Sequence, residues 1–251
     1  MELISAALGS NQAALSEYES KQFLGKRGIP VCREALASDA LSAAKRADEI
    51  SYPVVLKACG PRLFHKSDVG GVALNIRNRE EVIATGEALL GIEGCEALLV
   101  QELVAGAREL ACGLVRQPQF GPCVMFGLGG VLTEVLEDVA FRLAPLREGD
   151  AREMLREIRA RKILEAFRGE APVDEESLTR ILVTLGQIGV EEEGIDGIDI
   201  NPLKIQRNGK PVAVDALVIL NSPGDSPSPT PEAHGGRWPA PLIFPPDSVA
   251  S

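Results

Sequence analysis

The chain has 251 residues, 45% hydrophobic and 25% charged, which is ordinary for a globular protein of one large or two small domains. Its net charge of −10 argues against nucleic-acid binding. No apolar run approaches the roughly 20 residues of a membrane span, and the N-terminus lacks the pattern of a signal peptide. The five cysteines form no C-x-x-C pair. We therefore expect a cytoplasmic protein without a zinc site, a disulfide framework or a membrane partner.

The first half of the chain alternates between helical and extended patterns. No element is predicted in the N-terminal segment 1–15, and a capping box of Ser16 with Glu19 then predicts the start of a helix that ends at Gly28. The pattern next predicts a strand over 31–37, a helix over 39–50 capped by Ser38, a buried strand over 54–58, a loop over 59–71, a strand over 72–77 and a helix from Asn78 to about residue 90.

The second half begins with apolar runs that suggest a mainly antiparallel sheet. They lie at residues 97–100, 110–115, 123–126 and 141–143, and are followed by predicted helices over 150–167 and 174–191 and by strands over 197–200 and 212–220. The order predicts an α/β (α+β) fold of two subdomains with a ligand cleft between them. Residues 222–251 hold eight of the 17 prolines and read as a Pro/Ser-rich disordered tail.

The polar loop that follows the buried strand 54–58 contains His65, one of two histidines in the chain. A lone histidine is usually an ordinary surface or core residue. However, reactive groups favour loops, and a neutral imidazole can accept and pass on a phosphoryl group near neutral pH. Gly70 and Gly71 follow and add backbone N–H groups that suit phosphate contact.

Lys57 and a glycine cluster are two further candidates for phosphate contact. Lys57 stands near the end of an apolar strand, where a lysine can either reach a cleft and neutralise phosphate charge or simply snorkel to solvent. The run Gly127–Gly130 resembles neither a P-loop nor a dinucleotide fingerprint, so by itself it indicates only a turn.

Oxygen ligands near the end of the chain could hold Mg²⁺. Asp199 and Asn201 alternate on one face of a predicted strand, and Asp215 comes alongside if the hairpin around Asn208-Gly209 forms. Such oxygens suit Mg²⁺, which takes one or two protein carboxylates plus substrate phosphates. Turn chemistry at Asn201-Pro202 explains the residues equally well.

Seven segments occur in an order that resembles one enzyme family. They are VVLKA, HKSDVGGV, LLVQELVAGARE, GLGG, EVLEDVAFRLAPL, IDINPL and AVDAL. This order resembles the ATP-grasp subunit or domain of NDP-forming acyl-CoA synthetases, such as the β subunit of ADP-forming acetyl-CoA synthetase, and more distantly the β subunit of succinyl-CoA synthetase. The similarity covers about residues 16–220, which predicts an ATP-grasp domain over 16–221.

The resemblance implies a subunit that grips ATP or ADP with Mg²⁺ and exchanges phosphate with a CoA-binding α subunit or domain, in a hetero-oligomer. The reaction is acyl-CoA + ADP + phosphate to acid + CoA + ATP, in either direction, with a phosphohistidine on a mobile loop. The site residues so implied are His65 for phosphate transfer, Lys57, Gln101, Glu102 and Glu109 for the nucleotide, and Asn201 and Asp215 for Mg²⁺. Glu134, Asp138 and Arg142 match a further family segment, without individual roles.

Two other interpretations are open. Another ATP-grasp ligase could form an acyl phosphate directly, and would then bind nucleotide but tolerate the loss of His65. A regulatory module could bind nucleotide and dock a partner through residues 222–251. No CoA-binding domain precedes residue 16 and no second histidine lies within the predicted domain, so we expect this chain to need a partner for the full reaction.

Overall fold

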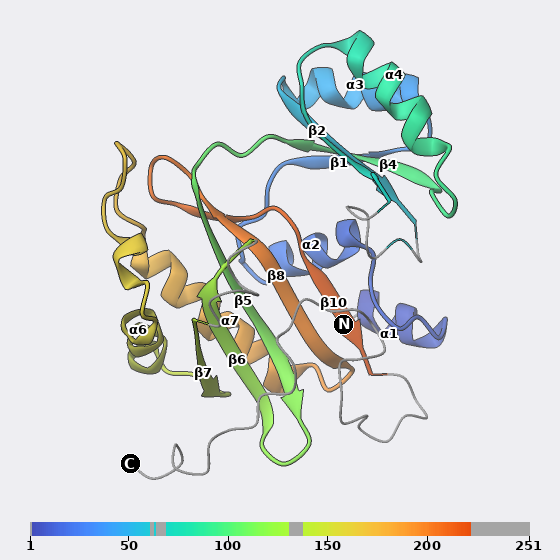
Figure 1. The fold of residues 1–251 in the computed structure, drawn as a ribbon. Coiled ribbons are helices and arrows are strands. Elements are labelled where there is room, and N and C mark those ends of the chain that lie inside the picture. Colours follow the sequence, from blue (N-terminus) through green and yellow to red (C-terminus); the bar gives the residue numbers. More distant parts are fainter. Residues whose placement is uncertain (1, 61–62, 64–68, 131–137, 222–251) are drawn as a thin grey trace.

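The computed structural model of the chain describes residues 2–60, 63, 69–130 and 138–221. Within them, strands form two separate antiparallel sheets, and helices cover one face of each (Figure 1). In the described part of the chain, no helix is long and apolar enough to cross a membrane.

The smaller subdomain is a four-stranded sheet with two helices. The strand order is β1 (Glu34–Ala37), β4 (Ala97–Glu102), β2 (Val54–Cys59) and β3 (Val72–Ile76). Helices α3 (Ala40–Ile50) and α4 (Arg79–Leu90) pack against one face, where their apolar stripes meet the side chains of alternate strand residues. Buried alanines of α3, among them Ala43, Ala44 and Ala47, allow the helix to pack close to this face.

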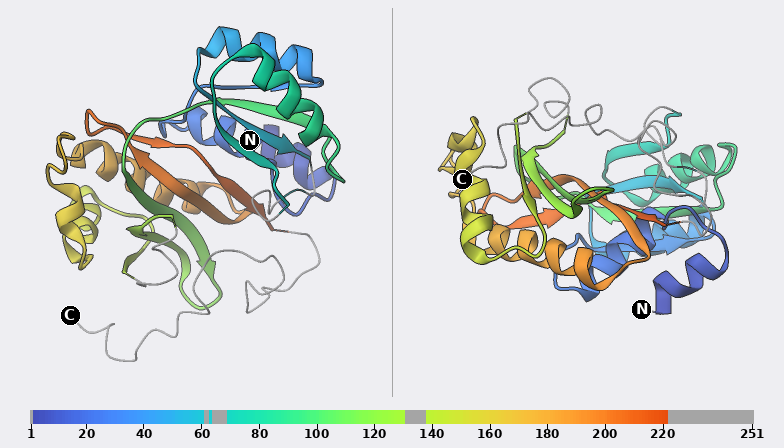
Figure 2. Two further views of the ribbon diagram at one scale, coloured as in Figure 1. Left: turned by 45° about the horizontal axis from the view of Figure 1, so that its top comes forward. Right: turned by 90° about the horizontal axis from the view of Figure 1, so that it is seen from below.

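The larger subdomain is built on a second sheet, which holds most of the core. Its strand order is β10 (Leu217–Leu220), β8 (Ile195–Ile205), β5 (Arg108–Gln117), β6 (Gly121–Leu128) and β7 (Val139–Leu143), with β9 (Pro211–Ala213) also paired to β8. The elements packed against it are α1 (Glu2–Gly9), α2 (Glu17–Lys26), α6 (Glu148–Glu157), the 3₁₀ helix η1 (Arg161–Leu164) and α7 (Glu175–Glu191). Figure 2 shows these helices on one side of the large sheet.

Helix α2 links the two subdomains. Its apolar residues Phe23 and Leu24 belong to the large core. Its charged residues Glu17 and Lys21 reach the small sheet. The predicted capping box fixes the start of α2, because the Ser16 Oγ accepts the N–H of Glu19 and a Glu19 carboxylate oxygen accepts the N–H of Ser16.

The predicted α/β (α+β) fold is confirmed, and several element boundaries are corrected. Helix α3 is capped by Asp39 and not by Ser38, because the Asp39 carboxylate accepts the Ser42 N–H. The helix predicted over 150–167 ends at Glu157, because the N–H groups of Arg159 and Ala160 donate to the Asp138 carboxylate. Segment 1–15, for which no element is predicted, contains α1.

Two predicted strands are also shorter in the structure. The first begins at Glu34 and not at residue 31, because the Cys32 N–H donates to the Ala213 carbonyl of the large subdomain. The strand predicted over 212–220 divides into β9 and β10. The interruption, Val214–Ala216, lies where the Val214 carbonyl accepts hydrogen bonds from two lysines.

Candidate functional site

The small sheet has one apolar face and one charged face, and the charged face turns toward the large subdomain. Residues Val54, Leu56, Leu98 and Val100 point toward α3 and α4. Their strand neighbours point the opposite way, and the register places Glu34 and Val55 on either side of Gln101, and Leu36 and Lys57 on either side of Leu99. Lys57, Gln101 and Glu34 therefore share the face that carries the candidate site.

Lys57 is buried between the two subdomains. Its Nζ lies 2.6 Å from Glu17 Oε1 of α2 and 3.0 Å from the Val214 carbonyl oxygen. The Asp215 Oδ2 lies 3.8 Å away. The structure therefore excludes the alternative of a solvent-exposed lysine and places the Lys57 ammonium beside Asp215, a predicted Mg²⁺ ligand.

A second buried lysine, Lys21, belongs to the same cluster and is not predicted from the sequence. Its Nζ donates to Glu17 Oε1 at 2.8 Å and to Gln101 Oε1 at 2.8 Å, and it pairs with the Glu34 carboxylate. Burial opposes its charge, but the neighbouring acidic groups, Glu17 first, outweigh burial and raise the pKa of Lys21. Lys21 thus stays an ammonium, and we call Glu17, Lys21, Glu34 and Lys57 the charge cluster.

Glu34 is the exceptional member of the charge cluster. Its side chain is 1% exposed and pairs with the Lys21 ammonium, and its carboxylate has no further hydrogen-bond partner among the described residues. Burial raises the pKa of Glu34 to about 7, against the opposite effect of the Lys21 ammonium. Nearby, burial also raises the pKa of the Cys32 thiol to about 12, so this cysteine is an inert neutral group.

The sequence contains a signal for Glu17 and Lys21. The buried positions of α2 include 17, 20, 21 and 24, which is the spacing of one helix face. Two charged residues in that buried stripe, four apart, are an ion pair inside the fold. Glu34 carries no such signal, because its burial depends on α2 lying against the sheet.

The neighbouring residues Gln101 and Glu102, both predicted to bind nucleotide, have different surroundings in the structure. Gln101 lies on the charged face and accepts from Lys21. Glu102 is held at the strand end, where its carboxylate accepts the backbone N–H of Arg33 at 2.8 Å and the Arg33 Nε at 3.0 Å. The structure therefore brings Gln101 to the charge cluster through Lys21, whereas Glu102 lies beside Arg33.

Glu109 and Asn201 come together around the glycine run. The Glu109 carboxylate pairs with Lys204 at 3.2 Å, and a Cβ on Gly130 would lie 2.4 Å from Glu109 Oε2. The Gly130 N–H donates to Asn201 Oδ1 at 3.0 Å. A Cβ on Gly129 would meet the Leu110 carbonyl at 2.3 Å. The glycines at 129 and 130 thus permit a close approach between strand ends.

Asn201 of β8 and Asp215, in the segment between β9 and β10, lie opposite each other in the backbone register. Leu203 pairs with Ala213 and Asp199 pairs with Leu217, so the same register sets Asp215 opposite Asn201. The hydrogen bond from Val214 N–H to the Pro202 carbonyl supports this register. One amide oxygen and one carboxylate fit Mg²⁺, which completes its shell with water and substrate phosphates. Within the described residues there is no cluster of three acidic, His or Cys side chains, which would suit a protein-only metal site.

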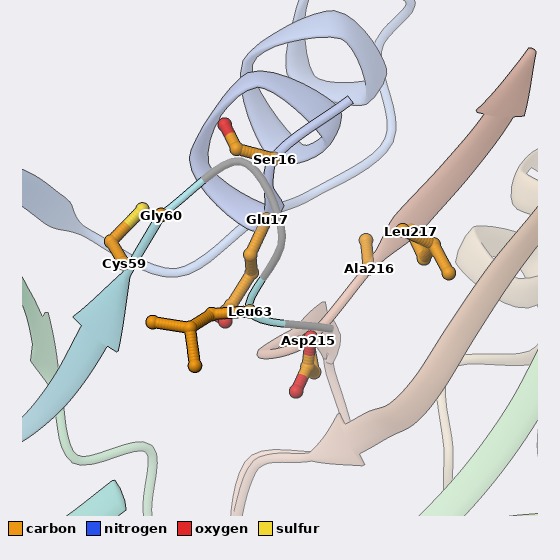
Figure 3. A pocket seen from close by; sticks show the side chains of 8 residues that line it. All are labelled: Ser16, Glu17, Cys59, Gly60, Leu63, Asp215, Ala216 and Leu217. Atoms are coloured by element: carbon orange, nitrogen blue, oxygen red, sulfur yellow. The ribbon is translucent and has the colours of Figure 1, made fainter. Parts of the chain in front are cut away.

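A small pocket adjoins the charge cluster and is lined in part by Glu17 (Figure 3). Glu17, the first residue of α2, and its cap Ser16 line it, together with Asp215 from the segment before β10 and Gly60 and Leu63 from the segment after β2. His65 and Glu134 lie outside the described residues. The pocket nevertheless contains Gly60 and Leu63, which precede His65 by five and two positions in the chain.

Asp138 and Arg142, to which the family resemblance gives no individual roles, make structural contacts. Asp138 is buried and accepts the N–H groups of Arg159 and Ala160, each at 2.7 Å. Arg142 donates to the carbonyl of Phe141 and pairs with Glu157 at 2.7 Å. Both residues therefore fasten the end of α6 to β7 and its approach.

Comparison with known proteins assigns the family. A model of the ATP-grasp domain matches residues 6–220. The chain belongs to the ATP-grasp family. It is 41% identical over 226 residues to the β subunit of acetate–CoA ligase [ADP-forming] I from Pyrococcus furiosus, over 87% of this chain and 97% of that protein.

Solved structures agree with this assignment. Dinucleotide-forming acetyl-coenzyme A synthetase 1 of Ca. Korarchaeum cryptofilum, in complex with coenzyme A, Ca-AMPCP and HgCl⁺, matches with a TM-score of 0.82 and 43% identity, over 88% of this chain and 99% of that one. Its complex with Mg-AMPPCP, whose phosphohistidine segment points towards the nucleotide binding site, matches with a TM-score of 0.78 at the same coverage. The predicted fold and the predicted family of ADP-forming acid–CoA ligase β subunits are confirmed.

Proposed function

We propose that this ATP-grasp subunit passes phosphate between Mg-ADP and a CoA-binding partner through a phosphohistidine at His65. One observation carries the proposal. The Lys57 ammonium lies 3.8 Å from Asp215, and Asp215 lines a pocket together with Gly60 and Leu63, just ahead of His65 in the chain. A cation and a candidate Mg²⁺ ligand therefore lie beside Gly60 and Leu63, the described residues of the segment that leads to His65 in the chain.

Each predicted residue has a role that its chemistry supports. Lys57 binds nucleotide phosphate oxygens, because positioning and charge neutralisation are the main demands of phosphoryl transfer. A neutral nitrogen of the His65 imidazole attacks the terminal phosphorus of ATP, forming an N–P bond as the bond to the ADP oxygen breaks; ATP synthesis is the reverse. Gln101, Glu102 and Glu109 orient the nucleotide. Asn201 and Asp215 would hold Mg²⁺, which neutralises phosphate charge when bound.

The proposed reaction needs acyl and CoA sites in addition to the nucleotide site of this chain. The acyl and CoA sites belong to a CoA-binding α subunit or domain, and the two form a hetero-oligomer in the cytoplasm. The Korarchaeum enzyme, with which this chain shares fold and 43% identity, has been solved with coenzyme A and a nucleotide analogue. We assign the ATP-grasp domain to residues 16–221, and residues 222–251 lie outside the described residues.

Labelling with ATP that is radioactive in its terminal phosphate tests the proposal. The purified chain with Mg²⁺ should gain acid-labile, base-stable label, and His65→Ala should gain none. The chain has a second histidine, His234, outside the described residues, and His234→Ala is the matched control that should label like wild type.

Label that survives His65→Ala, or a wild-type chain that binds Mg-ATP yet takes no label with or without the partner subunit, would contradict the phosphohistidine. The second result would favour direct formation of an acyl phosphate. Nucleotide affinity measured on the same samples separates a failure of transfer from a failure of binding.

A further inference from the structure

The Lys57 ammonium is oriented by two fixed acceptors. An ammonium has three N–H donors. Glu17 Oε1 at 2.6 Å and the Val214 carbonyl at 3.0 Å account for two of them. Asp215, at 3.8 Å, is a second carboxylate within ion-pair distance of Lys57 but lies beyond hydrogen-bond distance. One donor is therefore left for a phosphate on the Asp215 side.

Glu17 is itself held in place. It is the first residue of α2, whose start is fixed by the Ser16–Glu19 capping box. Its side chain is 2% exposed, and its Oε1 receives hydrogen bonds from both Lys21 and Lys57. Lys21 is completely buried and also contacts Gln101 and Glu34 of the small sheet. The carboxylate thus connects α2 to the small sheet through Lys57.

We propose that Glu17 is a positioning residue that aims the Lys57 ammonium at the nucleotide phosphates. This inference rests on the proposed function and adds a residue to it. A lysine side chain has about 2 kcal/mol of rotamer freedom, and a carboxylate that removes this freedom before the nucleotide arrives makes phosphate binding tighter. The same carboxylate also repels phosphate, which by itself would weaken nucleotide binding. If positioning outweighs repulsion, removing the Glu17 charge lowers the affinity for ADP; if repulsion outweighs positioning, it raises that affinity.

The experiment measures the affinity of the full chain for Mg-ADP and for adenosine, by calorimetry. Glu17→Gln keeps the shape and removes the charge, and we expect it to weaken ADP about tenfold and to leave adenosine unchanged, since adenosine has no phosphate. Glu17→Asp keeps the charge but withdraws the carboxylate by one methylene, and should also weaken ADP. Glu80→Gln removes an exposed carboxylate from the first turn of α4 and should change neither ligand.

A double-mutant cycle separates positioning from a general structural effect. If Glu17 acts through Lys57, then Glu17→Gln has no further effect on ADP affinity once Lys57→Met is present. Thermal unfolding of each variant establishes that it is folded. Additive losses, or an equal loss for adenosine, would show a structural role and overturn the inference.

The sign of the change is equally decisive. ADP affinity that is unchanged or higher in Glu17→Gln would mean that Glu17 competes with phosphate for Lys57, and the positioning role would be wrong. A wild-type chain that fails to bind ADP would refute the proposed function together with this inference, whereas normal wild-type binding with an unaffected variant refutes the inference alone.

Discussion

Arg108 and Lys57 are both buried cations, but their partners differ. Arg108 begins β5 and donates to the carbonyls of Ile163, Glu165 and Ala171, and to the Glu170 carboxylate. Lys57 has one carbonyl and one carboxylate within hydrogen-bond distance, and faces Asp215 beyond it.

The difference separates a structural cation from a functional one. Arg108 donates mainly to backbone carbonyls around η1, and these cannot move unless that segment unfolds. It therefore holds the segment against β5. Lys57 is bound by one side-chain carboxylate and one backbone carbonyl, and has a donor left on the side of a pocket. A buried cation whose N–H donors are all used within the fold has a structural role, whereas one that keeps a donor beside a pocket can bind a ligand.

The largest expected effect is on stability, from Arg108→Ala. Three carbonyls and a carboxylate would lose their donor in a buried site, which we expect to lower the free energy of unfolding by about 3–5 kcal/mol in urea titrations. The ADP affinity of the folded variant should equal that of wild type. Arg180→Ala, at an exposed pair with Glu176, is the control and should cost less than about 1 kcal/mol. A stable Arg108→Ala with weak ADP binding would reverse the assignment of the two cations.

A smaller effect concerns the pH dependence of the charge cluster. The pKa of Glu34 is raised to about 7 by burial, despite Lys21, so the folded state holds this proton more tightly than the unfolded chain. The contribution of Glu34 to stability is accordingly full at low pH and is lost as the pH rises through 7. The charged groups that face it are Lys21, Glu17 and Lys57, and the Cys32 thiol stays neutral in this range.

Glu34→Gln removes this titration. From pH 5 to pH 8, the variant should gain stability relative to wild type, on the order of 3 kcal/mol for a shift of this size. Urea unfolding at several pH values measures the slope, which is independent of any constant cost from the lost pairing with Lys21. Glu80→Gln should run parallel to wild type. If the Glu34→Gln and wild-type curves are parallel, Glu34 does not titrate in the folded protein between these pH values.

Local signals predict much of the fold. The Ser16–Glu19 box and the Asn78 cap depend on residues three apart, and each marks the start of its helix correctly. The break after Glu157 has no local signal, because it depends on hydrogen bonds to Asp138, which lies 21 and 22 positions from Arg159 and Ala160 in the chain. Long-range hydrogen bonds of this kind leave no periodic trace in the sequence.

In the candidate site, too, residues with a local sequence signal are predictable and those that depend on long-range packing are not. Lys57 is recognisable because a lysine is out of place in an apolar strand, and the opposition of Asn201 and Asp215 follows from a hairpin register. Glu34 becomes a site residue only when α2 packs against the small sheet. His65 was predicted from its loop and family segment, and remains a prediction because it lies outside the described residues.

The smallest expected effect concerns Glu102, which has a structural partner in Arg33 and is also a predicted nucleotide-binding residue. It pairs with Arg33, whose side chain is 64% exposed, and such a pair adds less than about 1 kcal/mol to stability. If Glu102 contacts the ribose, Glu102→Gln should weaken adenosine and Mg-ADP equally, by about threefold, in contrast to the phosphate-dependent loss expected at Glu17. Arg33→Gln, which leaves the carboxylate in place, should retain wild-type affinity for both. Wild-type affinities in Glu102→Gln would instead limit this carboxylate to holding the β1 approach against β4, and the nucleotide contacts at this strand end would then fall to Gln101 alone.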